Sequence, residues 1–182
     1  MENKERYNHL NEYYKNKFGE RTLKICIDAG FTCPNRDGTL SSSGCIFCSE
    51  KGAGELIKFS KLHISEQVNN FLNSYRGMRA NKFIVYFQNF TNTYDSLENL
   101  KEKYDAALVS DKIVGISIAT RPDCITEDIA KLIASYADKY DVSVELGLQT
   151  SNDNIGRIIN RYYTTTQFTT AVNILRKYNI EI

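Results

Sequence analysis

The 182-residue sequence contains no run of apolar residues that approaches the roughly eighteen of a membrane-spanning helix. Its N-terminal stretch, MENKERYNHLNEYYKNKFGER, is charged and aromatic and lacks the apolar core of a signal peptide. The net charge is only +1, which argues against electrostatic capture of nucleic acid by the chain as a whole. We therefore expect a cytoplasmic protein that does not insert into membranes, and nucleic-acid binding is not supported by the charge balance.

Low-complexity linkers and internal repeats are also absent from the sequence. A chain of this length can form one domain with its own core, and contents of 42% apolar and 25% charged residues are ordinary for a globular protein. The chain has five cysteines but no secretion signal. These cysteines are therefore better explained by metal or redox chemistry than by disulfides.

Three of the cysteines, Cys33, Cys45 and Cys48, lie in the stretch CPNRDGTLSSSGCIFC, a C-x11-C-x2-C spacing without an obvious fourth partner. A structural zinc site normally closes all four tetrahedral positions, whereas a [4Fe-4S] cluster held by three cysteines presents one iron to an outside ligand. Cys26, in a predicted strand, or His63, near a predicted helix start, could complete a zinc site. The zinc alternative therefore stays open at this point.

Strand-like and helix-like segments alternate along the chain. Residues 23–28, 83–88, 113–119 and 142–148 read as strands. Helices are predicted to begin at the caps Ser65, Asp95 and Thr126. The first of them carries apolar residues at helical spacing as far as Tyr75, and Phe168 to Leu175 mark a last helix. Four strand–helix units in series predict a parallel sheet with right-handed crossovers.

Three of the predicted strands separate apolar from small or polar side chains. In the last strand Val142, Val144, Leu146 and Leu148 form one face, and Ser143, Glu145, Gly147 and Gln149 form the other. The third separates Val114, Ile116 and Ile118 from Gly115, Ser117 and Ala119, and the first separates Leu23, Ile25 and Ile27 from Lys24, Cys26 and Asp28. The second predicted strand separates apolar from polar side chains less well, with Ile84 and Tyr86 ahead of Gln88. Because a sheet buried on both faces should be apolar on both, the pattern predicts helices on one side and a polar lumen on the other. The alternative is an open sheet with one solvated face.

The cysteine loop follows the first strand, at the end where barrel enzymes place their chemistry, and Phe47 directly precedes its last cysteine. In these features the chain resembles the radical S-adenosylmethionine (SAM) superfamily. In that family three cysteines hold a [4Fe-4S] cluster, SAM chelates the fourth iron, and reductive cleavage yields a 5′-deoxyadenosyl radical. The blocks CPNRDGT, YFQNFTNTY, GISIATRPDC, VELGLQT and INR are similar to those of the bacterial YhcC-type radical SAM family, a group without an agreed substrate.

The resemblance implies a radical SAM enzyme with a partial (β/α) barrel fold of parallel strands, about four βα units being present. A one-electron donor such as flavodoxin or ferredoxin would be its partner. More distantly, the layout is similar to anaerobic coproporphyrinogen oxidase and to the tRNA-modifying elongator catalytic subunit, and the latter alone suggests RNA modification. In the oxidase a Gln at the end of strand four and an Arg of an Asn-Arg motif contact SAM. Gln149 and Arg161 match that order and separation.

The resemblance has departures. Gln88-Asn89 replaces a Gly-Gly pair that serves the SAM amino group, Ala119 stands where related proteins often have Glu, and Tyr162-Tyr163 replaces Gly-His. The residues that we expect to contact SAM, which is the second cofactor beside the cluster, are Phe47, Gln88, Asn89, Ser117, Thr120, Arg121, Glu145, Gln149 and Arg161. No catalytic side chain is assigned. Cys124 is interpreted as a packed thiol rather than a radical relay. Glu145 is equally explained by an ion pair with Arg121 or Lys24.

The residues after 178 look like the start of a fifth strand. We therefore expect an N-terminal extension over residues 1–22 and an incomplete radical SAM core over residues 23–182, with strand five onward missing. The alternative function is a zinc-stabilised binding module on a catalytically inactive barrel fragment. A third possibility is a fragment that binds the cluster but does not cleave SAM.

Overall fold

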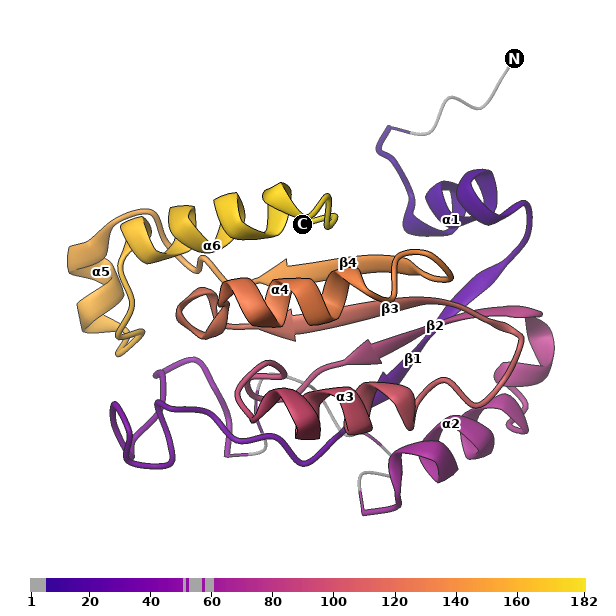
Figure 1. Ribbon diagram of the computed structural model, residues 1–182, viewed down its shortest axis with the longest axis horizontal. Helices are drawn as coiled ribbons and strands as arrows, with labels where there is room; N and C mark the ends of the chain where they lie inside the picture. Colours follow the sequence, from indigo (N-terminus) through magenta and orange to yellow (C-terminus); the bar gives the residue numbers. More distant parts are fainter. Residues whose placement is uncertain (1–5, 51, 53–56, 58–60) are drawn as a thin grey trace.

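Four parallel strands form a sheet in the order β1-β2-β3-β4 (Figure 1). The computed structural model describes residues 6–50, 52, 57 and 61–182. The strands are β1 (Thr22–Ile27), β2 (Lys82–Phe87), β3 (Ile113–Thr120) and β4 (Asp141–Leu146). Each lies within two residues of its predicted position. The predicted parallel, partial-barrel fold is therefore confirmed.

Helices precede, connect and follow the strands. They are α1 (Leu10–Phe18), α2 (Ile64–Leu72), α3 (Leu97–Asp105), α4 (Glu127–Ala134), α5 (Asp153–Ile158) and α6 (Thr165–Lys177), with the short 3-10 turns η1 (Gly77–Arg79) and η2 (Pro122–Cys124). In Figure 1 α3 and α4 lie in front of the strands. Sequence reasoning found α2, α3, α4 and α6 but missed α1 and α5.

The apolar face of the sheet packs against these helices. Ile27 of β1, Ile118 of β3 and Val144 of β4 are at most 1% exposed and belong to the same core as Leu100 of α3 and Leu175 of α6. Removing this apolar surface from water is the main favourable contribution to folding. On the opposite face Cys26 and Glu145 are exposed and Lys24 is partly exposed, as the pattern predicted, whereas Ser117 is buried.

The strand β2 departs from the alternation. Ile84, on the polar face, is only 3% exposed, and the pairing register between β2 and β3 shifts between Phe83 and Ile84. The polar face is therefore apolar at one place along its second strand. This is the strand whose pattern fitted the prediction least well.

The helix starts test the predicted caps. Thr126 caps α4 as predicted, with its side chain accepting from the Ile129 amide. By contrast, the N-cap of α2 is His63, two residues before the predicted cap Ser65, because the His63 ring and Glu66 form a reciprocal capping box. Ser96 caps α3 in place of Asp95, whose carboxylate instead accepts from Asn99 Nδ2 at 2.8 Å.

The segments after α2 and at the C-terminus were also predicted from the sequence. Tyr75 lies beyond the end of α2 and is 76% exposed, so its predicted apolar position in that helix is wrong. Near the C-terminus, Glu181 pairs in parallel with Ser143 of β4, and the Val144 amide donates to the Glu181 carbonyl at 2.8 Å. The residues after 178 thus run alongside β4.

The carboxyl ends of the four strands meet at one edge of the sheet. In Figure 1 the strand arrows point toward the cysteine loop and α5. The Thr91 amide donates to the Thr32 carbonyl at 3.1 Å, and the Gly147 amide donates to the Thr120 carbonyl at 3.3 Å, so the loops after neighbouring strands contact each other. No helix in the described part of the chain is long and apolar enough to cross a membrane.

Candidate functional site

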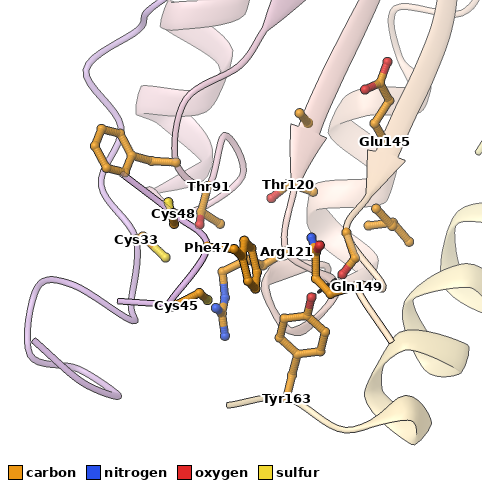
Figure 2. A pocket seen from close by; sticks show the side chains of 14 residues that line it. Cys33, Cys45, Phe47, Cys48, Thr91, Thr120, Arg121, Glu145, Gln149 and Tyr163 are labelled. Carbon is orange, nitrogen blue, oxygen red and sulfur yellow. Dashed lines mark hydrogen bonds between the residues drawn. The ribbon is translucent and has the colours of Figure 1, made fainter. Parts of the chain in front are cut away.

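A cavity of about 300 Å³ opens at this edge of the sheet. Its walls come from the cysteine loop and from the segments that follow β2, β3 and β4 (Figure 2). The residues that line it are Cys33, Cys45, Phe47, Cys48, Phe90, Thr91, Ala119, Thr120, Arg121, Glu145, Leu146, Gly147, Gln149 and Tyr163. Sequence segments up to 130 residues apart therefore contribute to one site.

All three cysteines of the predicted cluster loop line this cavity. The loop is held by its own side chains: Arg36 donates to the backbone carbonyls of Cys48 and Ser49 at 2.7 and 2.6 Å. Asn35 Nδ2 donates to Cys45 Sγ at 3.2 Å. Burial raises the pKa of the Cys45 thiol, and the hydrogen bond from Asn35 opposes that shift.

The geometry does not form a single-ion site. Within the described residues, no three His, Cys, Asp or Glu side chains are grouped closely enough to hold one metal ion. Cys26 and His63, the two candidate fourth zinc ligands, are absent from the lining of the cavity. Cys26 is exposed on the polar face of β1, and His63 caps α2 with Nδ1 at 2.8 Å from Ser65 Oγ.

Cys124 also lies apart from the main cavity. It lines a separate cavity of about 420 Å³, where burial raises the pKa of its thiol to about 12. The thiol is therefore neutral at physiological pH. This placement agrees with the interpretation of Cys124 as a packed thiol.

Five of the nine side chains predicted to contact SAM line the cavity: Phe47, Thr120, Arg121, Glu145 and Gln149. The structure places them on the loop and on the ends of β3 and β4, as Figure 2 shows. Gln149 adopts a left-handed backbone conformation with φ of 65°, which turns the chain directly after β4. Glu145 lies within β4, before the turn that contains Gln149, and Figure 2 shows it well apart from the three cysteines.

The other four predicted residues are outside the lining. Gln88 and Asn89 follow β2, where Asn89 Nδ2 donates to Asp28 Oδ2 at 3.2 Å. Ser117 is 2% exposed within β3 and donates to Glu145 at 3.4 Å. Arg161 is completely buried.

The guanidinium of Arg161 is occupied by the protein itself. Its Nη1 donates to the carbonyl of Leu148 at 2.9 Å and to that of Thr150, its Nε donates to the Tyr163 carbonyl at 2.9 Å, and its Nη2 donates to Asp153 Oδ1 at 2.7 Å. A carbon added at Gly156 would lie 2.8 Å from Nη2, so the glycine makes room for the guanidinium. Arg161 thus holds the turn that contains Gln149, and does not face the cavity.

Arg121 supplies the positive charge in the lining. It forms a bidentate ion pair with Asp123, at 3.0 and 2.8 Å, and is 8% exposed. Its guanidinium carbon lies 4.8 Å from the centre of the Tyr163 ring, and that of Arg161 lies 4.7 Å from the same ring. Burial raises the pKa of Tyr163 to about 12, although both guanidiniums oppose the shift. The phenol is therefore protonated, and it donates to the Gly147 carbonyl.

Sequence reasoning missed two notable lining residues. Tyr163 stands at the position where the family pattern has His, which is the one signal that could have pointed to it. Thr91 is completely buried, and its Oγ1 has no hydrogen-bond partner among the described residues. Its only signal was its place in the YFQNFTNTY block. Leaving a buried hydroxyl without a partner is costly, so Thr91 Oγ1 is a hydrogen-bonding group that the described residues do not satisfy.

A polar network lies on the sheet face beside the cavity. Glu145 accepts from Lys24 Nζ and from the Tyr86 hydroxyl, both at 2.7 Å, and Lys24 lies 4.2 Å from the centre of the Tyr86 ring. Burial tends to raise the pKa of Glu145, but the hydrogen bonds from Lys24 and Tyr86 outweigh it and lower the pKa below its ordinary value. The carboxylate is therefore ionised. Of the two predicted ion-pair partners, Arg121 and Lys24, it is Lys24 that pairs with Glu145.

The chain is similar to known proteins over most of its length. A sequence model of the family described as the radical SAM superfamily matches residues 29–182. The uncharacterised protein YtqA of Bacillus subtilis is 39% identical over 178 residues, covering 97% of this chain and 55% of YtqA. The protein YhcC of Escherichia coli is 32% identical over 167 residues, covering 91% of this chain and 53% of YhcC. The chain thus spans about half the length of the curated relatives it matches.

A solved structure agrees with the fold. The structure described as native anSMEcpe with bound AdoMet superposes with a TM-score of 0.55 at 18% sequence identity. The match covers 88% of this chain and 42% of that chain. At this identity the match supports the fold alone.

The buried guanidinium predicts a stability effect. Arg161→Lys should lower the free energy of unfolding by about 2–4 kcal/mol, because an ammonium cannot reproduce four bonds in the fork geometry and leaves buried oxygens unpaired. Urea unfolding of the variant measures this. Arg157→Lys, on the exposed side of α5, is the matched control and should change the free energy by less than about 0.5 kcal/mol. Equal stability of Arg161→Lys and the wild type would contradict the structural role.

The network around Glu145 predicts a pH dependence. A carboxylate with a lowered pKa in the folded state stabilises the protein above its ordinary value of 4.5, and this contribution is lost as the pH falls through the folded pKa. Glu145→Gln should therefore be less stable than the wild type at pH 7, and the difference should vanish in acid. Urea midpoints across this range measure it, with the exposed Glu102→Gln as control. A stability difference between Glu145→Gln and the wild type that stays constant with pH would show that the ionised carboxylate does not stabilise the fold.

Proposed function

Because the chain belongs to the radical SAM superfamily, we propose that it binds a [4Fe-4S] cluster through Cys33, Cys45 and Cys48 and binds SAM in the same cavity. The observation that carries this proposal is the convergence of the three cysteines with Thr91, Arg121 and Gln149 around one cavity. With both cofactors bound, the site would supply one-electron reductive cleavage of SAM to a 5′-deoxyadenosyl radical, given a donor such as flavodoxin or ferredoxin.

The donor set suits an iron-sulfur cluster. Thiolates are the soft ligands that iron-sulfur clusters and zinc select. A single zinc ion needs all its ligands at about 2.0–2.3 Å from one point, and no described group of three side chains meets such a requirement. A cluster accepts each thiolate on a different iron, so its ligands stand farther apart. Three thiolates on one loop are therefore a suitable donor set for a cluster that keeps one iron open.

The rest of the lining suits SAM, whose methionine end carries an ammonium and a carboxylate. Thr91 Oγ1, which has no partner among the described residues, is an acceptor for an N–H donor. Arg121 presents a planar, permanently charged group, and its bonds to Asp123 use only Nε and Nη2. Phe47 and Gln149 form further parts of the wall, apolar and amide in character. We propose these four residues as the SAM contacts of this chain.

The remaining predicted contacts take other roles in the proposal. Arg161 holds the Gln149 turn in place. Asn89 is fixed by its bond to Asp28, so that segment would serve through its backbone. Glu145, at the far side of the cavity, would present an ionised carboxylate to a substrate rather than to SAM.

We also propose that residues 23–182 carry the core and that residues 1–22 form an extension attached to it. The extension is anchored through α1, where Tyr14 is buried and Lys17 forms ion pairs with Asp141 at 2.7 Å and with Glu181 at 2.8 Å. These contacts join the extension to the start of β4.

Reconstitution with iron and sulfide under anaerobic conditions tests the proposed ligands. The wild type should become brown and contain about four irons per chain. Replacing Cys33, Cys45 or Cys48 by Ser should remove most of the iron and the visible absorption, because serine does not supply the soft thiolate. Iron analysis and absorption spectra measure both.

Two cysteines outside the cavity provide matched controls. Cys26→Ala and Cys124→Ala should retain the iron content of the wild type, because neither thiol lines the cavity. A wild type that takes up one zinc and no cluster would overturn the proposal. Equal loss of iron in the Cys26 variant would show that the ligand set is wrong.

A further inference from the structure

The Asn35 side chain forms a hydrogen bond to the sulfur of Cys45, one of the proposed cluster ligands. It is completely buried, and Nδ2 donates both to Cys45 Sγ at 3.2 Å and to the Asn160 carbonyl at 2.6 Å. An amide nitrogen carries two hydrogens, so both are committed. The two acceptors lie 10 and 125 residues away in the sequence.

The oxygen of the Asn35 side-chain amide, Oδ1, is buried and has no hydrogen-bond partner among the described residues. Burying a carbonyl oxygen unpaired is unfavourable, and a residue of similar shape without polar atoms would avoid that cost. The N–H bonds to Cys45 and Asn160 are thus the interactions that this side chain makes in return.

We propose that Asn35 is a positioning residue that raises the reduction potential of the cluster through its N–H···S bond to Cys45. This inference rests on the proposed function, since it needs a cluster ligated by Cys45. A hydrogen bond to a ligand sulfur stabilises negative charge on the cluster and does so more strongly after one electron has been added. The reduced state is therefore favoured.

The second bond of Asn35 extends this role to the other wall of the cavity. The Asn160 carbonyl that it binds belongs to the turn before Arg161, and the Ile46 amide donates to the neighbouring Ile159 carbonyl at 3.2 Å. Arg161 in turn binds the carbonyls on either side of Gln149. Asn35 thereby links the position of Cys45 to that of the Gln149 turn.

Asn35→Leu tests the proposal, because leucine has a similar size and donates no hydrogen bond. Redox titration of the reconstituted cluster, followed by electron paramagnetic resonance, should show a lower midpoint potential. The expected change is about tenfold in the reduction equilibrium, or ~59 mV for one electron. Asn35→Asp is the second variant: measured at a pH where the new carboxyl is ionised, it also lacks the donor and adds negative charge, so its potential should be lower still, and it decides the matter if the leucine variant does not fold.

Asn92→Leu is the matched control. Asn92 is also completely buried, and its Oδ1 also has no partner among the described residues. Its Nδ2 also makes two hydrogen bonds, but both are to carbonyls, those of Asn89 at 3.1 Å and Ala119 at 2.7 Å, and neither is to a sulfur. Its removal should leave the potential unchanged. A potential in both Asn35 variants equal to that of the wild type overturns this inference alone, as does an equal shift in Asn92→Leu. A wild type without a cluster overturns the proposed function as well.

Discussion

The burial of one apolar sheet face under the helices is the constraint on which the rest of the structure depends. Alternating side chains on parallel strands assign residues such as Ile27 and Val144 to the core and leave Lys24 and Glu145 on the other face. Because all four strands run the same way, their loops meet at one edge. The cysteines and the other cavity residues are brought together there although they are distant in sequence.

Within that edge, buried polar groups give the loops their shape. Arg161 binds the carbonyls around Gln149, and Asn35 binds both Cys45 and the Asn160 carbonyl next to Arg161. Such contacts are costly if left incomplete, and they hold two loops that have no regular secondary structure in a single arrangement. The cavity is therefore shaped by side chains that do not line it as much as by those that do, such as Arg121.

The sequence predicted the strands and the cysteine loop because both have local signals, alternation in one case and spacing in the other. It predicted the ion pair of Glu145 with Lys24 only as one of two options, since the choice depends on which strand lies opposite. The burial of the Arg161 and Thr91 side chains could not be predicted, because loop residues have no periodicity that reports burial. The helix α1 was not predicted for a related reason. Its one buried residue is Tyr14, and a single buried residue gives no helical periodicity in the sequence.

We propose that the cavity holds a cluster whose open iron position binds SAM. Electron paramagnetic resonance of the reconstituted, dithionite-reduced wild type with and without SAM measures this binding. SAM should change the signal of the reduced cluster, because SAM would become a ligand of one iron. An identical signal in both samples, from a protein with about four irons per chain, would overturn the proposed binding.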